Sequence, residues 1–301
     1  MSASTALVLL LLQSTPSGTA SDSAAITAPA DTIRSDSLAK PVPKQRGLAG
    51  RAGHMVTNFA SDVGFVATSP FRLSTKDALI TAAVLGATAI VYSYDNEIAR
   101  ATQRAEGNPA YDAVLDVGNT FVEVGFMGST WPYWVGGAVV STALDIDPVQ
   151  SICLDVIESH LIAGGLRNAA KFIIGRDHPF EADRSTFFVQ GTSMPSGHTS
   201  VVFELATIFT RHTEGLAPAV QWGVGITSYG IATAVALQRV DTSAHWASDV
   251  ILGGAMGALV ANTVVNRNQE RRRNEGVAGG PTLIPTLDSA GQPALALEWR
   301  F

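Results

Sequence analysis

The strongest constraint on the fold is a series of long apolar segments that carry almost no charge. Several of these runs reach 16–20 successive residues with few charged side chains. A run of about 20 apolar residues is long enough to span the hydrocarbon core of a bilayer. The segments are rich in Ala, Gly, Ser and Thr, which favours helices that pack closely on one another. We predict six long helices, over residues 76–94, 127–145, 149–174, 196–212, 217–237 and 244–266.

The composition agrees with this prediction of an all-α, six-helix bundle. Charged residues make up 15% of the 301 residues and apolar residues 46%, whereas an average soluble domain has about 25% charged residues. The deficit indicates a membrane protein or a very buried core, and we favour the membrane because long apolar runs are difficult to solvate. A shorter amphipathic helix is expected near residues 108–124. Gly253, Gly254 and Gly257 form a small-residue surface that fits a membrane interface or close core packing equally well.

The two ends of the chain have a different character from the body. Residues 1–20 resemble a signal peptide, with an apolar run at 6–12 and small residues at 18–20, although the positively charged start is missing. Residues 21–56 are rich in Ser, Ala, Asp, Thr and Pro, which predicts a flexible, disordered linker. The helical domain is then assigned to residues 57–268. For residues 269–301 we expect a basic linker followed by a small β-hairpin.

Charge and cysteine content exclude several classes of function. The net charge is −6 and no basic stripe is visible, so nucleic acid is not expected as a partner. Cys153 is the only cysteine, which excludes an internal disulfide and a multi-cysteine metal site. Its place in an apolar segment indicates a buried small hydrophobic residue.

The segment Pro195-Ser196-Gly197-His198 opens a predicted helix. The N–H groups in the first turn of a helix have no partner within the helix, so they can hold an anion. Gly197 would allow a phosphate to come close, and the Ser196 hydroxyl adds a donor. His198 would lie beside the anion, where it can protonate a leaving alkoxide. Taken alone, these four residues are better explained as an ordinary proline-containing helix start.

His245 and Asp249 are four residues apart at the start of the last predicted helix, so they share one face. A carboxylate bonded to one imidazole nitrogen fixes the tautomer and leaves the other nitrogen free as a nucleophile or base. Arg239 ends the preceding helix and can bind two phosphate oxygens. Lys171, Arg176 and His178 lie at the end of an earlier helix. Each residue has an ordinary structural explanation by itself, but the ordered set at helix ends favours a phosphate site.

These segments together resemble the type 2 phosphatidic acid phosphatase family, which includes bacterial class A acid phosphatases and vanadium haloperoxidases. The family pattern is Lys, six residues, Arg-Pro; then Pro-Ser-Gly-His; then Ser-Arg, five residues, His, three residues, Asp. Here Lys171 is followed by six residues and His178-Pro179, and the second segment matches fully. The third segment matches from Arg239 through His245 to Asp249, with Gln238 in place of Ser. The resemblance covers roughly residues 76–266.

The resemblance implies a role for each matched residue. His245 would be the nucleophile that forms a phosphohistidine, Asp249 would orient it, and His198 would be the general acid. The phosphate oxygens would be held by Lys171, Ser196, Gly197 and Arg239. His178 stands where the family has arginine. A protonated His178 can still pair with phosphate, and Arg176 is expected to take over part of that role. No metal or other cofactor is implied, and vanadate is expected to inhibit.

The expected function is therefore hydrolysis of phosphate monoesters or diphosphates, on a phospholipid or polyprenyl phosphate in a membrane. The active site is expected to face the periplasm or exterior, because Lys and Arg residues before the first helix and at 267–273 would then lie inside. A cleaved leader would invert this orientation. The alternatives are a soluble periplasmic acid phosphatase, a vanadate-dependent haloperoxidase and a non-catalytic membrane binding protein.

Overall fold

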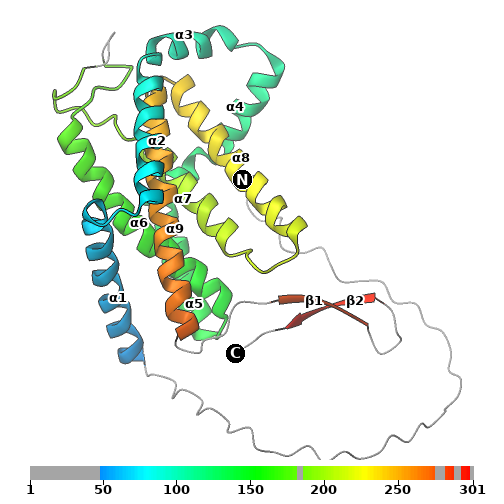
Figure 1. Ribbon diagram of the computed structural model, residues 1–301. Coiled ribbons are helices and arrows are strands. Elements are labelled where there is room, and N and C mark those ends of the chain that lie inside the picture. Colours follow the sequence, from blue (N-terminus) through cyan, green and yellow to red (C-terminus); the bar gives the residue numbers. More distant parts are fainter. Residues whose placement is uncertain (1–47, 182–185, 275–281, 288–292, 299–301) are drawn as a thin grey trace, which may run out of the picture. The chain divides into compact units, whose positions relative to one another are not determined.

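The computed structural model describes residues 48–181, 186–274, 282–287 and 293–298 (Figure 1). The leader predicted for residues 1–20 and most of the predicted linker lie outside this range. The described part is mostly helical. Its α-helices are α1 (Leu48–Thr68), α2 (Thr75–Tyr92), α3 (Asp95–Ala105), α4 (Pro109–Phe121), α5 (Met127–Ala143), α6 (Asp147–Ile174), α7 (Gly197–Arg211), α8 (Pro218–Asp241) and α9 (Ala247–Asn274). Two short 3-10 helices are η1 (Ser69–Phe71) and η2 (Val122–Gly125).

Each of the six predicted long helices overlaps one observed helix, from α2 and α5 to α9, and the predicted amphipathic helix corresponds to α4 with η2. The prediction omits α1 and α3. Helix α1 begins inside the segment assigned to the linker, and α9 continues through the basic run that was assigned to a second linker. Arginine is a good helix former and its charge is favourable near a helix C-terminus. Arg271 also binds Asp62 of α1 through two nitrogens, which ties both segments into the fold.

A two-stranded antiparallel sheet follows the helices in the chain. Strand β1 (Thr282–Leu287) pairs with β2 (Pro293–Glu298), with Thr282 opposite Glu298 and Leu287 opposite Pro293. Residues 288–292, between the two strands, lie outside the described residues.

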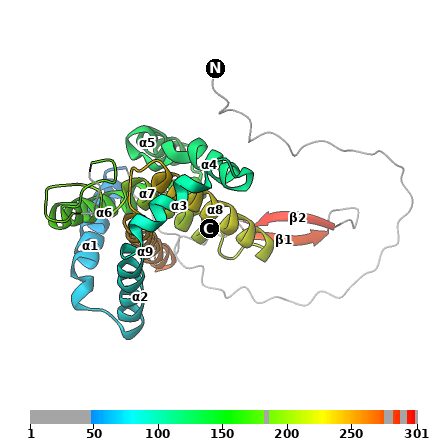
Figure 2. The ribbon, with the colours of Figure 1, turned by 90° about the horizontal axis from the view of Figure 1, so that it is seen from above.

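Helix α7 packs against α6, α8 and α9, with α2 lying along α9 (Figure 1). Its apolar side chains Val201, Leu205 and Ile208 are at most 3% exposed. They meet apolar residues of α5, α6 and α9 in one cluster. Helix α4 lies against α8 on another side (Figure 2). The start of α7 is therefore fixed from several directions.

Glycines on α9 allow α7 to approach with almost no gap. A methyl group added at Gly253 would lie 2.5 Å from the carbonyl oxygen of Ser196, and one added at Gly257 would lie 2.0 Å from that of Ser200. The small-residue surface predicted on this helix is thus a packing surface for α7. The contact presses the first turn of α7 against α9.

Three described helices, α2, α8 and α9, are long and apolar enough to cross a membrane. Helix α2 exposes much of its apolar surface in the isolated chain. Leu79, Leu85 and Ile90 are 66%, 55% and 64% exposed, respectively. Large apolar side chains left in water at this density indicate a surface that is covered by another apolar medium.

We expect Gly257→Ala to destabilise the protein by about 1–3 kcal/mol, because the added methyl group overlaps the α7 backbone and the two helices must separate. The matched control is Gly230→Ala on α8, where no atom lies within 4 Å of the new methyl group. That change should be neutral or stabilising by up to about 1 kcal/mol. Thermal unfolding of the two purified variants in detergent measures the difference, and equal melting temperatures would contradict this packing.

Candidate active site

Four helix ends and one loop bring the predicted residues together. Lys171 lies in the last turn of α6, His198 in the first turn of α7 and Arg239 in the last turn of α8. Asp249 lies in the first turn of α9, and His245 lies in the loop between α8 and α9. Residues separated by almost 80 positions in the chain therefore meet at one end of these helices.

Nearby cationic side chains affect the protonation of His198. The pKa of His198 is lowered to about 4, first because its imidazole is buried and then because positive charges lie around it. These charges belong to Arg239, Arg167 and Lys171, and His245 contributes only when it is protonated. A site in which cations gather around a neutral imidazole is suited to an anion.

His245 and Asp249 lie close together but a third residue joins them. The distance from His245 Nδ1 to Asp249 Oδ2 is 3.7 Å, too long for a hydrogen bond. Ser193 Oγ lies 3.3 Å from His245 Nδ1 and donates its hydrogen to Asp249 Oδ2. Since a hydroxyl donates only one hydrogen, Ser193 must accept from the Nδ1–H of His245. This fixes the tautomer in which His245 Nε2 carries the free lone pair.

The free lone pair is also favoured by the charge state of His245. Its side chain is 7% exposed, and burial lowers the pKa of the imidazole below its usual value. The charges of Lys171 and His178 lower the pKa further, and Asp249 acts in the opposite direction. A neutral imidazole with its Nε2 lone pair available is the form that can attack phosphorus or accept a proton.

Arg176 has a different place from the one expected. It is fully buried and forms ion pairs with Asp95 and Asp249. Ser248 accepts a hydrogen bond from the same guanidinium at 2.7 Å and donates to Asp95. A fork-shaped guanidinium that is engaged by two carboxylates holds their positions. Arg176 is therefore placed to orient Asp249, and its expected part in binding phosphate is not supported by this arrangement.

His178 lies beside the nucleophile candidate. Its ring centre is 5.4 Å from that of His245 and 5.0 Å from that of Phe180. Its Nδ1 lies 3.1 Å from a carboxylate oxygen of Glu181.

Lys171 and Arg239 lie in the site but differ in their present partners. Lys171 Nζ donates to the carbonyl oxygen of Thr192. Burial first, and then the charge of Arg167, lower the pKa of Lys171 to about 8. Arg239 Nη1 donates to Gln238 at 3.4 Å, whereas its Nε is buried and has no hydrogen-bond partner in the part of the chain that the structure describes. Gln238, which stands in place of the Ser of the family pattern, donates to Asn119 on α4 at 3.1 Å.

At the start of α7, the N–H of Gly197 is better placed to donate to an anion than the N–H and hydroxyl of Ser196. Ser196 is fully buried, its N–H donates to the carbonyl oxygen of Asp249, and its hydroxyl lies 3.0 Å from that of Thr199. The Ser196 hydroxyl would have to rotate before it could donate to a ligand. Gly197 is the first residue of α7, so its N–H belongs to the unpaired set at the helix start.

Sequence reasoning missed three residues of this constellation. Arg167 is four residues before Lys171 on the same helix face, and that spacing was a readable signal. Ser193 and Asp95 gave no local signal, because their roles depend on residues far away in the chain. The partners of Ser193 are 52 and 56 positions away, and Arg176 is 81 positions from Asp95. Only the tertiary fold brings them to the site.

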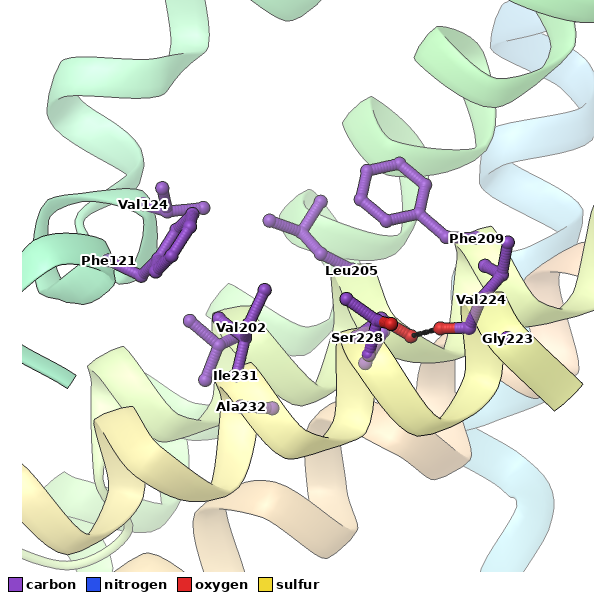
Figure 3. A pocket seen from close by; sticks show the side chains of 12 residues that line it. Phe121, Val124, Val202, Leu205, Phe209, Gly223, Val224, Ser228, Ile231 and Ala232 are labelled. Atoms are coloured by element: carbon purple, nitrogen blue, oxygen red, sulfur yellow. Dashed lines mark hydrogen bonds between the residues drawn. The ribbon is translucent and has the colours of Figure 1, made fainter. Parts of the chain in front are cut away.

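An apolar groove adjoins the site between η2, α7 and α8 (Figure 3). Its volume is about 490 Å³, and its walls include Phe121, Val124, Leu205 and Phe209. The hydroxyl of Ser228 donates to the carbonyl oxygen of Val224 in its own helix, so its hydrogen is not available to a ligand in the groove. Gly125, the neighbour of Val124, packs against His198, and a methyl group added there would lie 2.9 Å from the His198 carbonyl oxygen. The groove residue Val124 is thus the chain neighbour of Gly125, which contacts His198 in the site.

Comparison with known proteins found three similarities. Residues 153–273 match the family model described as the PAP2 superfamily. A lipid A 1-phosphatase of Porphyromonas gingivalis is 33% identical over 99 residues, which are 33% of this chain and 20% of that protein. The chain therefore matches about one fifth of the length of this curated relative. The crystal structure of a transmembrane PAP2-type phosphatidylglycerolphosphate phosphatase from Bacillus subtilis aligns with 73% of this chain and 98% of its own, with 18% identity and a TM-score of 0.44.

We expect Ser193→Ala to lower kcat about tenfold with little change in KM, because one hydrogen bond that fixes the His245 tautomer is lost. Ser151→Ala is the control, since that hydroxyl bonds only to its own helix on α6. Steady-state kinetics on a phosphate ester give both constants. A kcat for Ser193→Ala equal to that of the control would show that the bridge does not position His245.

Proposed function

We propose that this protein is a membrane phosphatase that hydrolyses phosphate monoesters or diphosphates on lipids, and the match of residues 153–273 to the PAP2 superfamily model supports this proposal. The observation that carries the proposal is the meeting of His245, His198 and Asp249 with Lys171 and Arg239 at four helix ends. This set contains a nucleophile, an acid and phosphate-binding cations. The reaction can be written with these residues alone, without a metal.

The proposed reaction has two steps. His245 Nε2 attacks phosphorus, the bond to the leaving oxygen breaks, and His198 gives that oxygen a proton. A water molecule then attacks the phosphohistidine, His198 accepts its proton, and His245 leaves as the free imidazole. Lys171, Arg239 and the N–H of Gly197 hold the phosphate oxygens as negative charge develops in the transition state. Asp249 stabilises the imidazolium that forms on His245.

The groove supports a lipid rather than a water-soluble ester as substrate. Its apolar walls suit an acyl or prenyl chain, and its volume of about 490 Å³ is within the usual range of ligand pockets. The head group would then lie at His198 while the chain extends along α7 and α8. The relative from Porphyromonas gingivalis is named a lipid A 1-phosphatase, so a lipid A phosphate belongs in the substrate panel with phosphatidate and polyprenyl diphosphate.

The proposed orientation places the site outside the cytoplasm. Asp249 and the basic run Arg271–Arg273 lie at opposite ends of α9, roughly 35 Å apart at 1.5 Å per residue. Cationic residues are enriched on the cytoplasmic side of membrane helices. If the basic end of α9 is inside, the phosphate site faces the periplasm or exterior.

The test is phosphate release from a panel of lipid phosphates and a water-soluble ester, by the full chain in detergent. We expect activity that resists a chelator, is inhibited by vanadate, and falls by at least about 10³-fold in His245→Ala, because the nucleophile is lost. Arg104→Met, a change at an exposed arginine of α3, is the control. Unchanged phosphate release by His245→Ala would overturn the proposal and favour a binding protein.

Proton uptake tests the role of His198. In the empty site His198 is neutral above about pH 4, because burial and surrounding cations lower its pKa to that value. A bound oxyanion reverses the electrostatic contribution and raises the pKa, so binding at pH 6 should take up a proton. Calorimetry of vanadate binding in buffers of different ionisation enthalpy counts these protons. His198→Asn should take up about one proton fewer than the wild type, and equal uptake would contradict protonation of His198 by the bound ligand.

A further inference from the structure

We propose that Arg167 binds an oxygen of the substrate phosphate and supplies the guanidinium that this chain lacks at His178. The inference rests on the proposed function and adds a binding residue to the same site. It follows from three observations on α6 and α7: the place of Arg167, its unpaired nitrogen and the engagement of Arg176 elsewhere.

The need for another guanidinium arises from the first motif. His178 stands where the resembled pattern has arginine, and its Nδ1 is already near Glu181. Arg176 is fully buried between Asp95 and Asp249. An imidazolium offers two donors in diverging directions, whereas a guanidinium offers a planar fork that matches two phosphate oxygens. Neither His178 nor Arg176 therefore provides the bidentate contact.

Arg167 lies beside the anion-binding turn. It is one helical turn before Lys171 on α6, so both side chains leave the same face. A methyl group added at Gly197 would lie 3.7 Å from Arg167 Nε and 3.8 Å from its Cδ. Its charge acts on both His198 and Lys171. The guanidinium thus flanks the N–H groups that begin α7.

The guanidinium is not fully satisfied in the empty site. Arg167 Nη1 is buried and has no hydrogen-bond partner among the described residues. A buried donor without a partner costs about 1–3 kcal/mol, and more when the group is charged. A phosphate oxygen at the start of α7 would provide the missing acceptor and compensate the charge.

Glu204 offers a competing explanation for Arg167. It is fully buried on α7, and neither of its carboxylate oxygens has a hydrogen-bond partner in the described structure. His160 Nδ1 lies 3.8 Å from Glu204 Oε2. The charge of Glu204 also interacts with that of Arg167. Arg167 would then serve only as a counter-charge for Glu204. The two roles differ in what happens when both charges are removed together.

The experiment measures vanadate inhibition and kcat/KM for Arg167→Met, Arg167→Lys and the double variants Arg167→Met with His178→Arg and Arg167→Met with Glu204→Gln. We expect Arg167→Met to weaken vanadate inhibition at least tenfold and to lower kcat/KM about 100-fold or more, as loss of a charge-assisted bond predicts. Arg167→Lys should show a smaller loss, because lysine keeps the charge without the fork. The double variant Arg167→Met with His178→Arg should bind vanadate at least tenfold more tightly than Arg167→Met alone. Glu204→Gln should restore none of the affinity lost in Arg167→Met.

Wild-type vanadate inhibition in Arg167→Met, or full recovery by Glu204→Gln, would overturn the inference. Failure of His178→Arg to restore any affinity would overturn the replacement of one guanidinium by the other. If Arg167→Met does not fold, the comparison of Arg167→Lys with the wild type decides by the same inhibition constant, with Arg104→Met as the control. His245→Ala separates the two proposals: if it is inactive while Arg167→Met equals the wild type, the phosphatase function stands and only the role of Arg167 fails.

Discussion

The buried ion pairs of Arg176 fix the geometry on which the site depends. Its guanidinium joins Asp95 at the start of α3 to Asp249 at the start of α9, and all three side chains are at most 2% exposed. Removing one member of such a buried pair leaves an uncompensated charge and typically costs about 3–5 kcal/mol. Ser248 holds Arg176 and Asp95 in this arrangement, because it accepts a hydrogen bond from Arg176 and donates one to Asp95. Arg176, which follows the end of α6 by two residues, therefore sets the position of the Asp249 carboxylate beside His245.

The chemistry-bearing residues were easier to predict from the sequence than their partners. Apolar runs indicated the long helices, and motif spacing placed Lys171, His198 and Arg239 at helix ends that lie around one site. His245 was expected within the last helix but lies in the loop before α9. Helix α3 was missed because it is short and polar, so no apolar run marks it; its value lies in presenting Asp95. The linker boundaries failed because the pairing of Asp62 with Arg271 stabilises segments whose composition alone does not indicate a helix.

The role expected for Arg176 shows why a motif cannot assign a partner. Arg176 and His178 are both close in sequence to Lys171, and either could face a phosphate. The residue at the helix end decides: Gly175 adopts a left-handed conformation with φ of 54°, which ends α6 and redirects the chain. After that turn Arg176 lies in the interior, whereas His178 lies beside His245. A reversal of this kind depends on tertiary packing as well as on local spacing.

The site also shows how an enzyme of this construction can hold a strong anion and still release it. Its cations are buried and close to one another, which lowers the pKa of Lys171 to about 8 and that of His198 to about 4 in the empty state. Mutual repulsion makes the empty site costly, so part of the attraction for phosphate is relief of that repulsion. Under the proposed function, His198 would be neutral before the substrate arrives and would gain a proton when the negative charge binds. The acid needed for the leaving oxygen would then be formed by the binding step itself, and it would lose its proton when inorganic phosphate departs.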